Sequence, residues 1–102
     1  MSKSTSFPTK TKLALERVAM IFRALGEVNR LKLIIATEKG GSSVSQLMAT
    51  TGLSQANVSK HLKVLADSGI LIRCRQGNYV MYSTTNSAVL MMCEKFSKAS
   101  CK

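Results

Sequence analysis

Acidic residues, aromatic residues and long apolar runs are all scarce in this chain of 102 residues. It has 5 Asp and Glu against 15 Lys and Arg, which gives a formal net charge of +10 at pH 7. This imbalance predicts attraction to polyanions, meaning nucleic acid or an anionic membrane surface. There is no Trp, with 2 Tyr and 3 Phe, whereas proteins that bind single strands by stacking usually need more rings. The composition therefore favours a nucleic-acid duplex over a single strand.

No apolar run approaches the roughly 18 residues from which a membrane-spanning helix is recognised. The N-terminus, MSKSTSFPTKTK, also lacks the apolar core of a signal peptide. We therefore expect a cytoplasmic protein without a membrane partner. A chain of this length forms one small domain with a modest core, so association with a second copy is an expected source of stability.

Chemically reactive groups are few. The three cysteines, Cys74, Cys93 and Cys101, include no C-x-x-C pair, which argues against a disulfide framework or a zinc finger. The chain has one histidine and few acids, and it shows neither a nucleophile–base pair nor a phosphate-binding loop. We expect no enzymatic activity and no cofactor.

Helical spacing of apolar residues predicts two helices in the first part of the chain. The first covers residues 9–25 and carries a wide apolar stripe. Gly26 separates it from a second helix over residues 27–38, which Gly40 and Gly41 end. The residues that we expect the second helix to bury are Leu31, Ile34 and Ile35.

Two short helices with a glycine turn between them follow. Ser43 with Gln46 three residues later predicts a capping box for a helix over residues 44–50. Gly52 then turns the chain, and Ser54 caps a fourth helix that ends near residues 67–69. The apolar edge of this fourth helix consists of Val58, Leu62 and Leu65. Such a helix pair is the shape that places its second helix in the major groove of DNA.

The pattern then changes to that of strands. Residues 70–75 and 79–84 are rich in β-branched and aromatic side chains, and Gly77-Asn78 between them predicts a hairpin. Helical spacing returns after Asn86. The predicted fold class is therefore mainly α with a β-hairpin wing, in the order four helices, hairpin, last helix. We expect the domain to comprise residues 9–99, with tails at 1–8 and 100–102.

The polar edge of the fourth helix has the chemistry of a DNA contact. Gln55 and Asn57 lie in its first turn, and both side chain types can bond adenine N6 and N7. Ala56 is small enough to let the helix approach the groove floor. Lys60 and Lys63 suit phosphates as point charges. The candidate DNA-binding residues of this segment are Ser54, Gln55, Ala56, Asn57, Ser59, Lys60, His61 and Lys63.

The hairpin extends the basic character. Arg73 and Arg75 share one face of its first strand, and Gln76 and Asn78 lie at its tip. An arginine there can enter the minor groove or hold the DNA backbone. A polar helix edge alone is more often a solvated surface than a DNA contact, so the glycine turn, the basic hairpin and the net charge decide for DNA. His61 borders the apolar stripe and has three interpretations: a packed or backbone-bonded side chain, a phosphate or base contact and, least favoured, a metal ligand.

Four segments in the right order resemble ArsR/SmtB family winged helix-turn-helix repressors. They are residues 24–35, the recognition helix 53–65, and the wing segments 69–73 and 77–82. The resemblance implies a homodimeric repressor that binds double-stranded DNA and reads an inverted repeat. It also implies that the first and last helices form the dimer, here through Leu15, Val18, Phe22, Val89, Met92 and Phe96.

The effector sites of the family are not carried over. The third helix segment has no Cys-x-Cys, the last helix has neither Asp nor His, and the second helix has no cysteine. We assign no metal ligands. Some arsenic-responsive members place cysteines late in the last helix, so Cys93 and Cys101 are candidates for sensing a metalloid, soft metal or oxidant. The alternative is a repressor without an effector. For Cys74 we expect a small buried residue.

A different class of function is also compatible with the composition. The chain could be a basic protein-interaction or membrane-surface module without sequence-specific DNA binding. The first helix distinguishes the two, because its apolar stripe is buried in a dimer and free in such a module.

Overall fold

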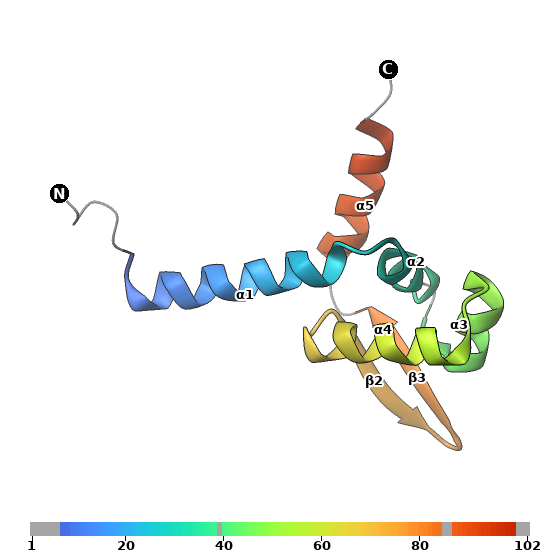
Figure 1. The fold of residues 1–102 in the computed structure, drawn as a ribbon. Coiled ribbons are helices and arrows are strands. Elements are labelled where there is room, and N and C mark those ends of the chain that lie inside the picture. Colours follow the sequence, from blue (N-terminus) through green and yellow to red (C-terminus); the bar gives the residue numbers. More distant parts are fainter. Residues whose placement is uncertain (1–6, 39, 85–86, 100–102) are drawn as a thin grey trace.

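The computed structural model describes residues 7–38, 40–84 and 87–99 (Figure 1). Its elements are α1 (Thr9–Leu25), α2 (Val28–Ala36), β1 (Ser42–Ser43), α3 (Val44–Thr51), α4 (Gln55–Asp67), β2 (Leu71–Gln76), β3 (Tyr79–Thr84) and α5 (Ser87–Ala99). The predicted winged helix-turn-helix order is confirmed. The short strand β1 was not predicted.

The core lies where α2, α3 and α4 meet the first residues of the wing. Its fully buried side chains are Leu33, Ile34, Leu47, Val58, Leu62 and Leu65. The prediction that Ile35 is buried is wrong, since this residue is 50% exposed. Leu33, which was not predicted to be buried, lies in the core instead of Ile35. The face of α2 that carries Leu33 and Ile34 packs against α3 and α4.

The sheet is antiparallel, with the strand order β1-β3-β2. The β2–β3 register runs from Leu71 opposite Thr84 to Gln76 opposite Tyr79, so the hairpin loop has two residues, Gly77 and Asn78. This confirms the predicted hairpin. Gly77 has φ +62°, a value that favours glycine or asparagine in such tight turns. On the other side of β3, β1 ties the start of α3 to the wing.

The end of α4 is set by backbone hydrogen bonds. The N–H of Gly69 donates to the carbonyl of Ala66 at 3.0 Å, and the N–H of Ile70 donates to the carbonyl of Leu65 at 2.9 Å. These two bonds form a Schellman motif, and Gly69 adopts the left-handed conformation that it requires, with φ +78°. Ile70 is then buried and directs the chain into β2. This turn therefore fixes the wing relative to α4.

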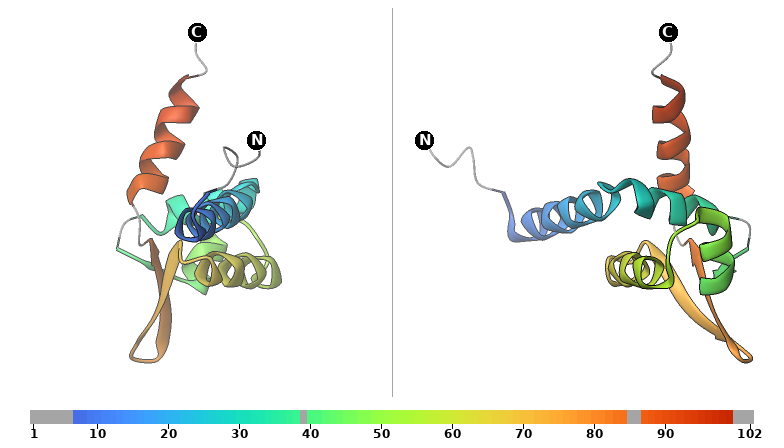
Figure 2. Two further views of the ribbon diagram at one scale, coloured as in Figure 1. Left: turned by 90° about the vertical axis from the view of Figure 1, so that its left-hand side faces the viewer. Right: turned by 45° about the vertical axis from the view of Figure 1, so that its right-hand side comes forward.

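The helices α1 and α5 project from this body in two directions (Figures 1 and 2). Within α1 the buried residues are Ala24 and Leu25, at the end that joins the body. The apolar stripe further out stays exposed, with Leu15 at 49%, Val18 at 45% and Phe22 at 56%. A single chain thus leaves these apolar side chains uncovered.

Replacing Gly69 by Ala tests the turn between α4 and the wing. An alanine at φ +78° costs about 1–2 kcal/mol, so we expect the free energy of unfolding in urea to fall by that amount. Gly26→Ala is the matched control, because Gly26 has φ −82° and an added Cβ would meet its nearest atoms at 3.5 Å. Equal stability of the two variants would contradict the inference that alanine is strained at position 69.

Candidate nucleic-acid interface

Side-chain caps fix the two helices of the helix-turn-helix. The predicted capping box is present, since the N–H of Gln46 donates to Ser43 Oγ at 3.2 Å and the N–H of Ser43 donates to Gln46 Oε1 at 2.9 Å. Gly52 ends α3 in the left-handed conformation. Ser54 Oγ accepts the N–H of Asn57 at 3.2 Å, so α4 begins at Gln55 with its cap in place.

The two edges of α4 separate cleanly into core and surface. Val58, Leu62 and Leu65 are at most 1% exposed. The residues of the opposite edge, which sequence analysis proposed for DNA contact, are exposed together with the cap residue: Ser54, Gln55, Ala56, Asn57, Ser59, Lys60 and Lys63. The structure therefore brings these candidates together on one surface.

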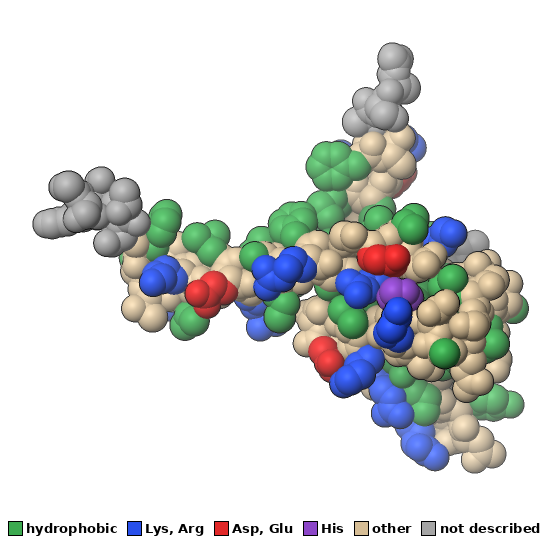
Figure 3. All heavy atoms as spheres, viewed as in Figure 1, with side chains coloured by type: hydrophobic (Ala, Val, Ile, Leu, Met, Phe, Trp, Pro, Cys, Tyr) green, Lys and Arg blue, Asp and Glu red, His purple; other side chains and the backbone are tan. Residues whose placement is uncertain are grey.

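The wing carries its arginines on the side of the sheet that packs on the helices. Arg73 lies opposite Tyr82 and Arg75 opposite Val80, in the same row as the buried Leu71. Both arginines are exposed, as are Gln76 and Asn78 at the tip. Figure 3 shows basic side chains in a line that crosses α4 and continues down the wing. The wing thus extends the surface of α4.

Cys74 lies on the other face of the wing. It pairs with Met81, and it is exposed, with its sulfur 3.8 Å from the carbonyl of Arg75. The prediction of a small buried residue is wrong. Ile72, which lies on the same face as Cys74, is also 52% exposed.

His61 is the one candidate on α4 that the structure buries. It is 5% exposed, and its Nδ1 accepts the Nε–H of Arg30 at 3.2 Å. Its Nε2 lies 3.8 Å from Oε1 of Glu27, the N-cap residue of α2. The packed interpretation therefore holds, but the partner is a side chain rather than the backbone. His61 therefore does not belong to the exposed surface of α4.

The surroundings of His61 disfavour its charged form. Burial of the imidazole lowers the pKa of His61 below its ordinary value of 6.5. The Glu27 carboxylate acts in the opposite direction and raises this pKa, while the cations of Arg30 and Lys60 lower it. The net direction is downward, so His61 is neutral at pH 7.

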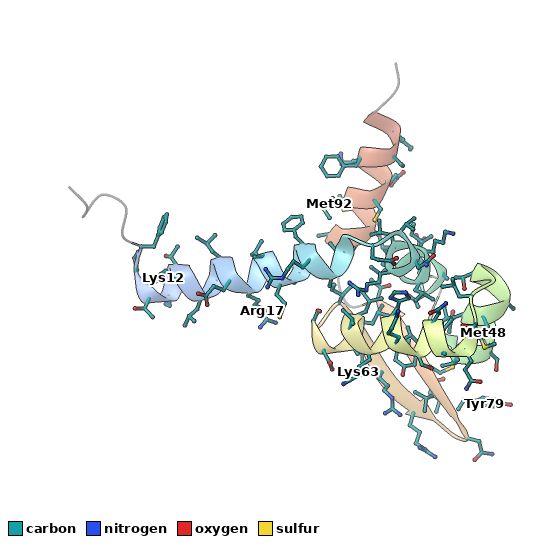
Figure 4. The ribbon with its side chains drawn as sticks, viewed as in Figure 1. Lys12, Arg17, Met48, Lys63, Tyr79 and Met92 are labelled. Atoms are coloured by element: carbon teal, nitrogen blue, oxygen red, sulfur yellow. The ribbon has the colours of Figure 1, made fainter. Side chains whose placement is uncertain are left out.

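Lys63 forms an ion pair with an acidic neighbour on α4. Its Nζ lies 3.2 Å from Oδ2 of Asp67, one helical turn further along α4. Figure 4 shows Lys63 projecting from α4 away from α1 and α2. Both side chains of the pair are more than two-thirds exposed, and such surface ion pairs contribute about 0.2–1 kcal/mol. A phosphate can therefore replace the carboxylate at little cost.

An apolar groove of about 590 Å³ lies between α1, α2 and α5. Of the residues proposed for the dimer, Phe22, Met92 and Phe96 line it, and Figure 4 labels Met92 on α5. Cys93 also lines the groove and is half-buried. Val89 is 6% exposed and belongs to the core of the protomer, so its side chain is not left for a second copy.

The described ranges contain neither a cluster of metal ligands nor a membrane-spanning helix. Within residues 7–38, 40–84 and 87–99, no three His, Cys, Asp or Glu side chains gather as metal ligands. Among the helices of these ranges, none combines the length and apolar character needed to cross a membrane. Cys101 lies outside the described residues.

Comparisons with known proteins agree with this architecture. A family model described as "Bacterial regulatory protein, arsR family" matches residues 27–73. The HTH-type transcriptional regulator YgaV from Escherichia coli is 34% identical over 76 residues, which cover 72% of this chain and 76% of YgaV. The chain belongs to the ArsR family.

A further sequence relative and a solved structure also resemble this ArsR-family chain. The HTH-type transcriptional regulator CmtR from Mycobacterium tuberculosis is 33% identical over 70 residues, or 69% of this chain. The match covers 59% of CmtR, so the chain spans about three-fifths of that relative. The homodimeric winged helix-turn-helix domain Mb0332 from Mycobacterium bovis superposes with a TM-score of 0.83 at 19% identity, over 95% of this chain and 93% of that one. This likeness shows the shared fold.

Membership of the ArsR family fits the prediction of a regulator rather than an enzyme. The family model starts at the N-cap of α2 and ends within β2. It therefore covers the helix-turn-helix and the first wing strand. The projecting helices α1 and α5 lie outside the matched range.

The lowered pKa of His61 predicts how stability depends on pH. The unfolded chain binds a proton at His61 more readily than the folded chain. The contribution of neutral His61 is therefore fully present above about pH 6.5, and the free energy of unfolding falls as the pH drops below it. Urea unfolding at fixed protein concentration should show a weaker pH dependence for His61→Asn than for wild type. Superimposable pH profiles would contradict this assignment.

Proposed function

We propose that this ArsR-family chain is a DNA-binding transcriptional repressor. In this proposal α4 enters the major groove and the wing follows the adjacent backbone or minor groove. The observation that carries the proposal is the exposed surface formed by Gln55, Asn57, Lys60 and Lys63 of α4 together with Arg73 and Arg75 of β2. No acidic residue lies in the stretch Gln55–Lys63, and the whole chain has a formal charge of +10.

The side chains on this surface divide into two roles. Gln55 and Asn57 stand in the first turn of α4 and read base edges, with Ala56 allowing close approach. Lys60, Lys63, Arg73 and Arg75 hold phosphates, which orient the protein without reading sequence. The capped N-terminus of α4 holds the reading residues on a rigid helix. Sequence preference and overall affinity therefore come from different residues.

The proposal includes a homodimer formed by α1 and α5. A second copy would cover the apolar stripe of Leu15, Val18 and Phe22, and the groove lined by Met92 and Phe96. The similarity to Mb0332, which is described as homodimeric, supports this arrangement. Two α4 helices would then meet successive major grooves about 34 Å apart and read an inverted repeat.

Regulation through thiols stays a prediction from the sequence. Cys93 lines the groove between α1, α2 and α5, so a modified thiol there would disturb the packing of the proposed dimer. The test is release of DNA by arsenite, cadmium or an oxidant. We expect the Cys93→Ser, Cys101→Ser double variant to keep DNA under these conditions if the thiols respond, and a double variant that still releases it removes the thiol hypothesis.

The contrast between Gln55 and Lys63 tests the two roles of α4. Loss of the Gln55 amide should lower discrimination at one base pair by about 1–3 kcal/mol, because a bidentate base contact is lost. Lys63→Ala should weaken all duplexes alike and reduce the slope of log affinity against log salt by about 0.9. Fluorescence anisotropy with a preferred and a shuffled duplex measures both effects. Unchanged sequence preference in Gln55→Ala would contradict base reading by this residue.

The oligomeric state tests the role of α1 and separates the repressor from a basic interaction module. We expect wild-type protein to be dimeric at micromolar concentration by sedimentation equilibrium. Val18→Lys should shift it towards the monomer, because a buried unpaired charge is costly. Ile72→Lys is the matched control, since Ile72 is similarly exposed but lies on the wing. A monomeric wild-type protein would favour the interaction module over the repressor.

A further inference from the structure

One side chain connects the end of α1, the start of α2 and the recognition helix. Arg30 extends from α2, and its Nη1 donates to the carbonyl of Ala24 at 3.3 Å and to that of Arg23 at 3.5 Å. Its Nε donates to Nδ1 of His61 on α4 at 3.2 Å. The guanidinium is planar and rigid, so these contacts hold three elements in one geometry.

The contact with Arg30 determines where the proton of neutral His61 lies. Arginine is permanently protonated and offers donors only, so Nδ1 of His61 must be the bare acceptor nitrogen. The single proton of the neutral ring is then on Nε2. Nε2 lies 3.8 Å from Oε1 of Glu27. This distance is too long for a hydrogen bond, but the protonated nitrogen faces a carboxylate. Glu27 itself is held at the start of α2, where it accepts the N–H groups of Asn29 and Arg30.

We propose that Arg30 and His61 are a positioning pair, which fixes the orientation of α4 relative to α1 while His61 is neutral and releases it when His61 is protonated. The inference rests on the proposed DNA-binding function, because it concerns how the recognition helix is held for that task. Neither residue is assigned a contact with DNA. The pair affects DNA binding only by positioning the exposed residues of α4.

Protonation removes the contact for a simple reason. A proton on Nδ1 replaces the acceptor by a donor, which then faces the Nε–H of Arg30, and two cations stand side by side. The charged groups around the ring are Arg30 and Glu27 at the start of α2 and Lys60 on α4. From α1 the neighbouring groups are the carbonyls that Arg30 holds. Glu27 is the one group of this set that attracts the imidazolium, so the protonated ring is drawn from Arg30 towards Glu27.

The neutral state is the resting state of the pair near pH 7. Burial lowers the pKa of His61, which agrees with a ring held as an acceptor. Acidification to about pH 5.5 then protonates part of the population, in the range where histidine commonly acts as a switch. The expected consequence is loss of sequence preference, while non-specific attraction to phosphates remains.

The first part of the test uses the full chain without DNA. His61 is the only histidine of the sequence, so its two ring nitrogens give unambiguous ¹⁵N resonances. We expect the Nε2-protonated tautomer at pH 7.5 and an Arg30 Nε–H resonance that shifts with the same midpoint as the ring. An Nδ1-protonated tautomer, or an Arg30 resonance that ignores the titration, overturns the pair.

The second part measures sequence preference at constant salt. A duplex is selected from a random library by the wild-type protein at pH 7.5, and its affinity is divided by that for a shuffled duplex. Between pH 7.5 and 5.5 we expect this ratio to fall for wild type, by at most about tenfold, because the lowered pKa of His61 leaves part of the population neutral at pH 5.5. His61→Asn should keep a high ratio at both pH values, because its amide oxygen replaces Nδ1 as an acceptor and does not titrate. Arg30→Lys keeps the positive charge but loses the planar guanidinium, which bonds through two nitrogens. This variant should have a low ratio at both pH values.

The outcomes separate this inference from the proposed function. A His61→Asn variant whose ratio falls with acid as in wild type overturns the positioning role of His61, although DNA recognition stands. A wild-type ratio that is high and independent of pH also overturns the positioning role of His61. If wild type prefers no duplex at pH 7.5 while the NMR results are as expected, the proposed function fails and the Arg30–His61 contact is supported.

Discussion

The burial of one edge of α4 is the constraint on which the rest of the interface depends. Val58, Leu62 and Leu65 have at most 1% exposure, and burying such side chains stabilises the fold by about 1.5–3 kcal/mol each. They are spaced four and three residues apart, so their burial fixes the rotation of the helix about its axis. Gln55 and Lys60 must then point outward. The polar edge does not contribute to the core and is therefore available for the proposed DNA contacts.

Sequence alone predicted the elements whose signals are local. The bounds of α1 and the start of α4 follow from periodicity and from the Ser54 cap, and the hairpin follows from Gly77-Asn78. The strand β1 was not predicted because a strand of two residues is too short to show an alternating pattern. In α2, apolar residues occupy too many positions for periodicity to select the buried side, so the choice of Leu33 over Ile35 depended on the neighbouring helices.

The same distinction explains which parts of the site were foreseen. Exposed polar residues of α4 need only the correct helical phase, which the apolar edge supplies. The bond between His61 and Arg30 joins positions 31 apart in the chain, and neither residue carries a local signal of the other. For Cys74, strand alternation predicted its face correctly but could not tell whether that face is covered. Contacts between distant segments are therefore what the structure added.

Arg30 contacts both α1, which carries an apolar surface, and α4, which carries a basic one. The apolar surfaces of α1 and α5 lie outside the segment that matches the ArsR family model, and the basic surface of α4 and β2 lies largely within it. Arg30 holds the last carbonyls of α1 with one nitrogen and the imidazole of α4 with another. Under the proposed function, the guanidinium that contacts the end of α1 also contacts the helix that reads DNA, so the dimer contact and the DNA contact would be linked through Arg30 and His61.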